Sequence, residues 1–69
     1  MGQINVIVNG RDVELSEGVV IQGLLDSLDI RTRGVAVELN MEIVPKGRYA
    51  QTVLKGGDRI EIIKMVGGG

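Results

Sequence analysis

The sequence predicts an α+β fold in which one helix packs on one face of a mixed sheet of about four or five strands. Apolar and polar residues alternate in short stretches near both ends of the chain, which is typical of half-buried strands. The spacing changes to a helical one only once, and turn residues separate the stretches. With 69 residues, the chain has room for a single domain.

The first fifteen residues are expected to form a β-hairpin. Apolar residues alternate with polar ones from Gln3 to Asn9, and the alternation resumes from Arg11 to Leu15. Between them, Asn9-Gly10 suits a two-residue type I′ turn, in which both central residues need a positive φ.

A helix is expected to begin near Val20. The apolar residues of this stretch recur at the spacing of one helix face: Ile21, Leu24, Leu25 and Leu28. Two features weaken the helix, because Gly23 lies inside it and no Ser, Thr, Asp or Asn directly precedes Val20 as a cap.

Three further strands are predicted after the helix, at Val35 to Leu39, Glu42 to Val44 and Arg59 to Val66. Asn40-Met41 is expected to be a turn, and Pro45 must end the short middle strand or confine it to an edge. Lys46 to Leu54 has no readable pattern.

The predicted element order is therefore ββαβββ, and the β-grasp fold has this order. In that fold the first and last strands lie side by side and parallel at the centre of the sheet. The turn Gly57-Asp58 is expected to start the last strand, which carries the C-terminus out at the end of the sheet.

The composition excludes most catalytic chemistry. The chain has no cysteine and no histidine, so thiol nucleophiles, imidazole bases and the usual soft metal ligands are missing. Glu38 and Glu42 could suggest a carboxylate pair, but nothing in the sequence supplies a base or a pocket beside them. We therefore expect no catalytic residue, no bound cofactor and no metal.

The charge and the hydropathy pattern limit the possible partners and the cellular location of the protein. The net charge is −1 and Tyr49 is the only aromatic residue, so the chain has neither a basic stripe nor stacking platforms for nucleic acid. No apolar run is long enough to cross a bilayer, and the first ten residues do not resemble a signal peptide. These features predict a cytoplasmic protein that is a monomer when alone.

The sequence ends in the glycines Gly67, Gly68 and Gly69. We expect a domain over residues 1–66 and a flexible tail over residues 67–69. Glycines have no Cβ and can pass through a narrow channel, so the tail could present its terminal carboxylate to a partner. The alternative is a frayed end without a role.

A partner-binding face is predicted on the side of the last strand that faces away from the helix. If Ile60 and Ile62 face the helix, the opposite face carries Ile7, Glu61, Ile63 and Met65. Val66, which follows Met65, is also expected to contact the partner. The alternative is that these are ordinary surface residues. The basic side chains of Arg31, Arg33, Lys46 and Arg48 could meet an acidic partner, but charges in linkers are usually only solvated.

Two segments resemble one family, Val35 to Pro45 (VAVELNMEIVP) and Gly57 to Gly69 (GDRIEIIKMVGGG). Together with the element order, they resemble the ThiS family of ubiquitin-like sulfur carriers in thiamin (thiazole) biosynthesis. The resemblance spans the chain, although many of these carriers end in two glycines instead of three.

The resemblance implies a function. A ThiF-type adenylating enzyme, related to the E1 ubiquitin-activating enzymes, would use ATP and Mg²⁺ to form an acyl-adenylate on Gly69. Sulfur would then replace AMP to give a thiocarboxylate, from which a ThiG-type thiazole synthase takes the sulfur. The alternatives are a MoaD-like carrier for molybdopterin or another pathway, a protein modifier, and an inert β-grasp interaction module.

Overall fold

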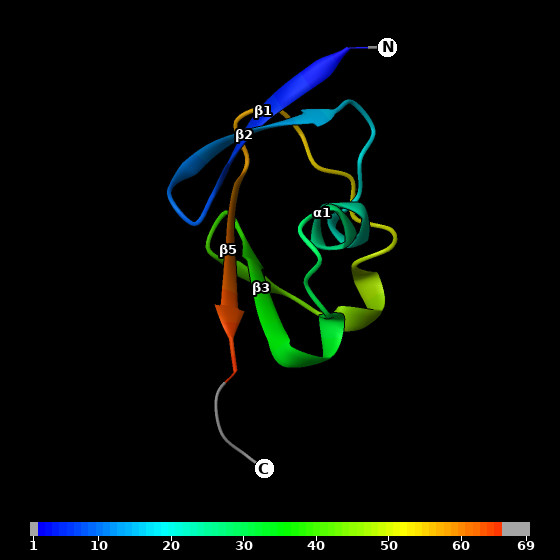
Figure 1. Cartoon of the computed structure of the whole chain (residues 1–69), viewed down its shortest axis with the longest axis vertical. Helices are drawn as coiled ribbons and strands as arrows, with labels where there is room; N and C mark the ends of the chain where they lie inside the picture. Colours follow the sequence, from blue (N-terminus) through cyan, green and yellow to red (C-terminus); the bar gives the residue numbers. More distant parts are fainter. Residues whose placement is uncertain (1, 66–69) are drawn as a thin grey trace.

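A computed structural model describes residues 2–65 and contains one five-stranded sheet with one α-helix (Figure 1). The elements are β1 (Gln3–Val8), β2 (Arg11–Ser16), α1 (Ile21–Ser27), η1 (Thr32–Gly34), β3 (Val35–Leu39), β4 (Glu42–Val44), η2 (Lys46–Arg48) and β5 (Arg59–Lys64). The strand order is β2-β1-β5-β3-β4. β1 and β5 are parallel, and the other neighbours are antiparallel. The predicted mixed sheet and its central parallel pair are confirmed.

Both hairpins turn through residues with positive φ. Asn9 and Gly10 have φ values of 49° and 83° and join β1 to β2, as predicted. Asn40 and Met41, with φ values of 51° and 74°, join β3 to β4. Met41 is unusual there, because the left-handed region is unfavourable for a residue with a long side chain.

The helix begins without a side-chain cap, as the sequence suggests. Backbone carbonyl groups from a distant segment accept its first N–H groups instead. The Ile21 N–H donates to the Thr52 carbonyl and the Gln22 N–H donates to the Tyr49 carbonyl, both at 3.0 Å. The segment before β5 therefore supplies what the helix N-terminus needs.

The helix ends at Ser27, one residue before the last apolar position of its pattern. Asp29 takes a φ of 59°, and the Ile30 N–H donates back to the Leu25 carbonyl at 2.9 Å, which is the six-to-one bond of a Schellman motif. Leu28 lies at this C-terminus and is 42% exposed. The prediction that Leu28 shares the buried face with Leu24 is therefore wrong, because the chain leaves the helix there.

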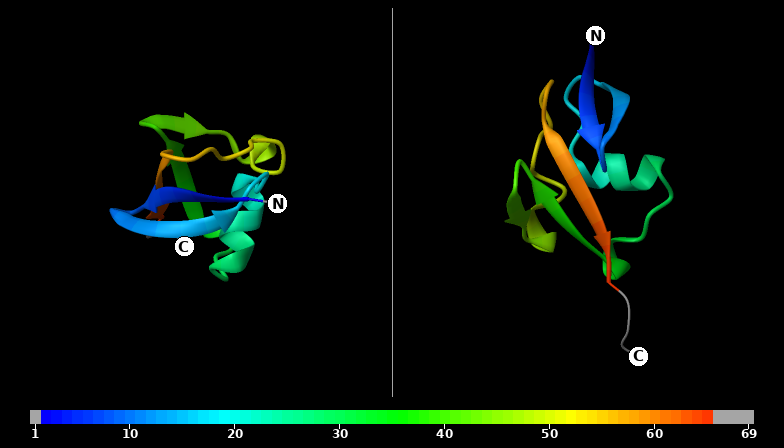
Figure 2. Two further views of the ribbon diagram at one scale, coloured as in Figure 1. Left: turned by 90° about the horizontal axis from the view of Figure 1, so that it is seen from above. Right: turned by 90° about the vertical axis from the view of Figure 1, so that its left-hand side faces the viewer.

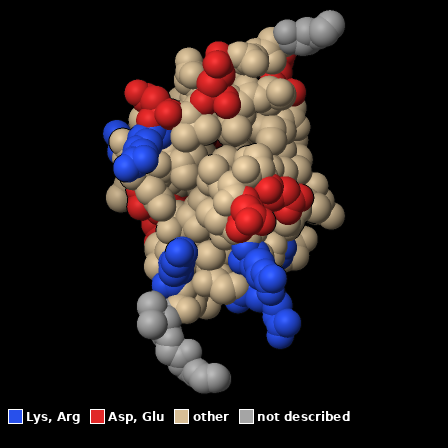
Figure 3. Space-filling model, viewed as in Figure 1, with Lys and Arg blue, Asp and Glu red and all other residues tan. Residues whose placement is uncertain are grey.

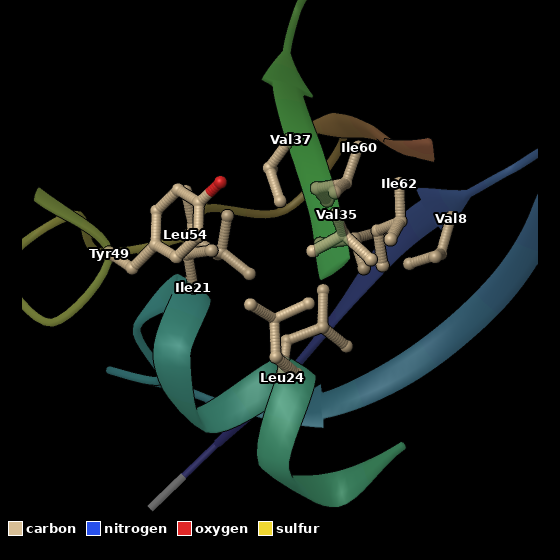
Figure 4. Close-up of a cluster of buried hydrophobic side chains, with 11 residues drawn as sticks. Val8, Ile21, Leu24, Val35, Val37, Tyr49, Leu54, Ile60 and Ile62 are labelled. Carbon is tan, nitrogen blue, oxygen red and sulfur yellow. The ribbon is translucent and has the colours of Figure 1, made fainter. Parts of the chain in front are cut away.

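The core lies between α1 and the sheet face that carries the alternate residues of β1, β3 and β5 (Figure 4). It contains eleven buried apolar or aromatic residues: Val6, Val8, Ile21, Leu24, Leu25, Val35, Val37, Tyr49, Leu54, Ile60 and Ile62. No polar or charged residue among residues 2–65 is buried. The core is thus almost wholly aliphatic, as the composition predicts.

The segment from Lys46 to Leu54 has no sequence pattern, yet it belongs to the core. It begins with η2, and it places Tyr49 and Leu54 against α1 with 1% and 2% exposure (Figure 4). Burial raises the pKa of the Tyr49 hydroxyl above 10.0, and a hydrogen bond with the backbone of Val37 opposes this effect in part. A single bridge between Val20 and Val53 fastens the segment beside the helix.

Two further views show the helix on one side of the sheet only (Figure 2). The opposite sheet face is uncovered by any element of residues 2–65. No helix in this part of the chain is long and apolar enough to cross a membrane.

Candidate functional site

The candidate site is the end of β5, from which the chain continues toward the glycines. The Met65 N–H donates to the Gly34 carbonyl at 2.9 Å, so pairing with the neighbouring chain continues one residue past β5. This end of β5 lies at one end of the molecule's long axis (Figure 1). Val66, Gly67, Gly68 and Gly69 lie outside the described residues, so the predicted tail stays a prediction.

The start of β5 is fixed by a turn, as the sequence predicts for Gly57-Asp58. Gly57 has a φ of 88°, and its N–H donates to the Asn5 carbonyl at 2.8 Å. The Asp58 carboxylate accepts hydrogen bonds from the Lys55 N–H at 2.8 Å and from the Asn40 Nδ2 at 3.0 Å. Gly57-Asp58 therefore has a structural role, which is to form the turn that begins β5.

The middle of β5 is held by the side chain of Asn9, which the sequence analysis treated only as a turn residue. The Asn9 Oδ1 accepts a hydrogen bond from the Ile62 N–H at 2.7 Å, and its Nδ2 donates to the Ile62 carbonyl at 3.3 Å. The side chain thereby pairs with β5 in the way that a further residue of β1 would. No sequence signal distinguishes this role from an ordinary Asn-Gly turn.

The outward face of β5 and the residue that follows it carry some of the predicted partner-binding residues. Burial alternates along the strand, so Glu61 is exposed, Ile63 is 45% exposed, and Met65, just beyond, is 60% exposed. The register places Ile63 opposite Ala36, which extends the apolar surface onto β3.

Ile7 does not join that apolar surface. It is only partly exposed, and its register partner is Arg59 at the opposite end of β5. Four residues of strand separate Arg59 from Ile63, which is about 13 Å. The prediction that Ile7 and Ile63 form one patch is therefore wrong, because the parallel pairing aligns Ile7 with the start of the last strand.

Two carboxylates face each other on the same outward surface. Glu38 and Glu61 are direct register partners between β3 and β5, and like charges in this arrangement are unfavourable. Glu42 pairs with Leu39 and lies on the other face, so Glu38 and Glu42 do not form a carboxylate pair. Within residues 2–65, no group of three or more acidic residues is arranged to hold a metal.

Basic side chains gather at the end of the molecule where β5 ends (Figure 3). Arg31 and Lys64 line a surface groove of about 620 Å³, together with Leu28, Asp29 and Met65. Lys46 is tied to the same region, since its Nζ donates to the Arg33 carbonyl at 3.3 Å. Three of the four predicted basic residues, Arg31, Arg33 and Lys46, therefore lie near the end of β5, and Lys64 joins them.

Comparison with known proteins gives a consistent family. The model of the ThiS family matches residues 2–69. A sulfur carrier protein ThiS of Bacillus subtilis is 43% identical over 63 residues, which are 90% of this chain and 96% of the relative. The crystal structure of a thiamine biosynthesis protein (ThiS) from Geobacter metallireducens superposes with a TM-score of 0.84 at 32% identity, over 96% of this chain and 100% of that one.

Another relative is much longer. A thiazole synthase of Paramagnetospirillum magneticum is 41% identical over 66 residues, but the match covers only 20% of its length against 96% of this chain. The present chain thus spans about a fifth of that synthase. The family model, the short carrier and the solved structure all match nearly the whole chain. The chain therefore belongs to the ThiS family, whose ubiquitin-like β-grasp fold it shares.

Proposed function

We propose that this chain is a sulfur carrier for thiazole formation in thiamin biosynthesis, and that its working group is the backbone carboxylate of Gly69. The observation that carries the proposal is the ThiS family match, which includes the glycines. The central position of β5 supports it, because a strand paired on both sides is a firm base for a tail that must enter another protein.

The carboxylate needs activation before it can accept sulfur. A terminal carboxyl group has a pKa of about 3.3 to 3.7, so it is an anion at neutral pH and resists nucleophiles. Its oxygen attacks the α-phosphorus of ATP and expels pyrophosphate, which gives an acyl-adenylate. A hydrosulfide-equivalent sulfur then adds to the carbonyl carbon, and AMP leaves with the electron pair of the broken C–O bond. The product is a thiocarboxylate.

The apparatus for these steps belongs to a partner. The sequence contains no cysteine and no histidine, which are common catalytic nucleophiles and bases, and this supports the proposal that the chain is a carrier on which the catalytic residues of a partner act. We propose a ThiF-type, E1-like adenylating enzyme that supplies ATP and Mg²⁺. The chain contributes access, since its three glycines, when extended, would place the carboxylate about 10 Å beyond Val66.

The sulfur acceptor is a ThiG-type thiazole synthase. A region of the Paramagnetospirillum synthase resembles this whole chain, which supports a physical association between carrier and synthase. We propose that Glu61, Ile63 and Met65, on the face away from the helix, contact these partners in the cytoplasm, together with Val66. Ile7 would contribute only where a partner spans the full length of β5.

Intact-mass spectrometry tests the proposal. The chain is incubated with a ThiF-type enzyme, ATP, Mg²⁺ and a sulfur source, and we expect the mass gain of an oxygen-to-sulfur exchange at Gly69. A variant lacking Gly68 and Gly69 is the control and should gain nothing. Adducts on lysines of other proteins would indicate a modifier, and an unchanged mass with active enzyme would refute the proposal.

A further inference from the structure

The last residue of β5 faces a free edge of the sheet. Every second residue from Asp58 onward directs its backbone groups toward β1. The Asp58 and Ile60 carbonyls accept hydrogen bonds from Ile7 and Asn9 N–H groups, both at 2.9 Å, and Ile62 pairs with the Asn9 side chain. Lys64 is next in this series, so its N–H and carbonyl point the same way.

No strand remains on that side to receive the Lys64 groups. β1 ends at Val8, and the chain turns at Asn9-Gly10 into β2. In Figure 1, the lower half of β5 has β3 on one side and no strand on the other. The pairing of β5 with β1 ends at Val8 and Ile60, and within residues 2–65 no turn, loop or side-chain hydrogen bond involves the Lys64 N–H or carbonyl. Ile63, by contrast, belongs to the pairing with Ala36 of β3.

The surroundings of this edge are basic. The Lys64 side chain lies on the helix side of the sheet, where it lines the groove with Arg31. Asp29 is the only acidic residue among the groove's lining residues. An edge with unpaired N–H and C=O groups is a template for an added strand, and cations beside it favour acidic side chains on that strand.

We infer that an extended, acidic segment of the adenylating partner adds as a strand to the free edge of β5 at Lys64. The inference rests on the proposed function, because a partner that takes the tail must contact the chain directly beyond Met65. A second copy of this chain is the poorer occupant. Pairing the two Lys64 edges would bring Lys64 and Arg31 of both copies together, and these like charges repel.

Amide hydrogen exchange, followed by NMR, tests the strand addition. In the free chain the Lys64 amide is expected to exchange at least about tenfold faster than the Ile63 amide, which pairs with β3. On addition of a ThiF-type enzyme, the Lys64 amide should become protected from exchange, while the Ile63 amide should remain protected. A Lys64 amide that exchanges freely in a complex with the enzyme overturns the inference.

Two substitutions of Lys64 distinguish the contribution of its backbone N–H to binding from that of its side-chain charge. Lys64→Pro removes the outward N–H without touching the β3 pairing, and proline is tolerated at such edge positions. We expect it to bind the enzyme about tenfold more weakly than Lys64→Ala, because it loses a hydrogen bond and obstructs the strand. Lys64→Ala keeps the N–H and should weaken association only by the loss of one charge, which also makes the affinity less dependent on salt.

A matched proline control lies on the other edge of the sheet. Glu14 of β2 pairs with Asn5 of β1, and Glu14→Pro should leave enzyme binding unchanged. Equal affinities of Lys64→Pro and Lys64→Ala would overturn the inference, as would concentration-dependent dimers in which the Lys64 amide is protected without enzyme. Wild-type chain that binds the enzyme but never gains sulfur would instead refute the proposed function.

Discussion

Asn9 is expected to be among the most sensitive polar positions of the fold. Asn9→Gly keeps the positive φ that the turn requires but removes both hydrogen bonds to Ile62. Each such bond contributes about 0.5 to 1.5 kcal/mol, and the loss leaves the partly buried Ile62 N–H unpaired, so unfolding free energy should fall by about 2 kcal/mol. For a domain of this size, that corresponds to a Tm lowered by roughly 8 to 16 °C.

Urea unfolding followed by circular dichroism measures the effect, and three variants make it specific. Asn9→Ala should lose about 1 kcal/mol more than Asn9→Gly, because alanine is strained at a φ of 49°. Asn9→Asp keeps the oxygen that accepts the short bond from Ile62 and should lose less. Asn40→Gly is the comparison, since Asn40 has a similar φ and two side-chain bonds, but exposed ones.

The reasoning would be refuted by an Asn9→Gly variant as stable as the wild type. That result would mean that water replaces the side-chain bonds to Ile62 at no net loss. A loss in Asn40→Gly as large as that in Asn9→Gly would show that burial of the side-chain bonds does not determine the effect, because the Asn40 Oδ1 also accepts a hydrogen bond from β5, at the exposed Arg59 N–H.

Three further predictions concern other positions. Met41→Gly should raise the free energy of unfolding by about 0.5 to 1 kcal/mol in urea titrations, because the φ of 74° is free of strain for glycine; no gain would contradict the strained turn. Burial raises the pKa of Tyr49 above 10.0, so the unfolded chain loses this proton first and stability should fall as the pH rises past about 10. The free energy of unfolding of Tyr49→Phe should not show this loss above about pH 10. If the free energy falls equally with pH in the wild type and in Tyr49→Phe, Tyr49 does not cause the loss. Ile63→Glu should weaken binding to the adenylating enzyme about tenfold in calorimetry without changing the melting curve, whereas Ile43→Glu, farther from β5 on the same face, should bind normally.

The sequence predicted the sheet well because its strands obey a simple period. Alternation identified the buried set of β5, Ile60 and Ile62, and Asn-Gly identified the first turn. The helix was less well predicted, since Leu28 keeps the helical spacing although the backbone leaves the helix there. A left-handed Asp29 ends the helix, and aspartate carries no clear signal for that conformation.

The remaining gaps concern contacts between distant residues. Tyr49 is buried and the Thr52 carbonyl caps α1, yet neither role has a local pattern, because both depend on the path of Lys46 to Leu54 around the helix. The same holds at the candidate site. Alternation placed Ile63 and Glu61 on the outward face, but only the pairing register revealed that Ile7 lies apart from Ile63 and that Lys64 faces a free edge.

The position of β5 between β1 and β3 has a mechanical consequence. A pull applied to Met65 along the axis of β5 loads the hydrogen bonds on both of its flanks simultaneously, in shear, instead of unzipping them one after another. Such an arrangement resists force far better than an edge strand does. The sheet is therefore expected to stay folded when a partner applies force to this end of β5.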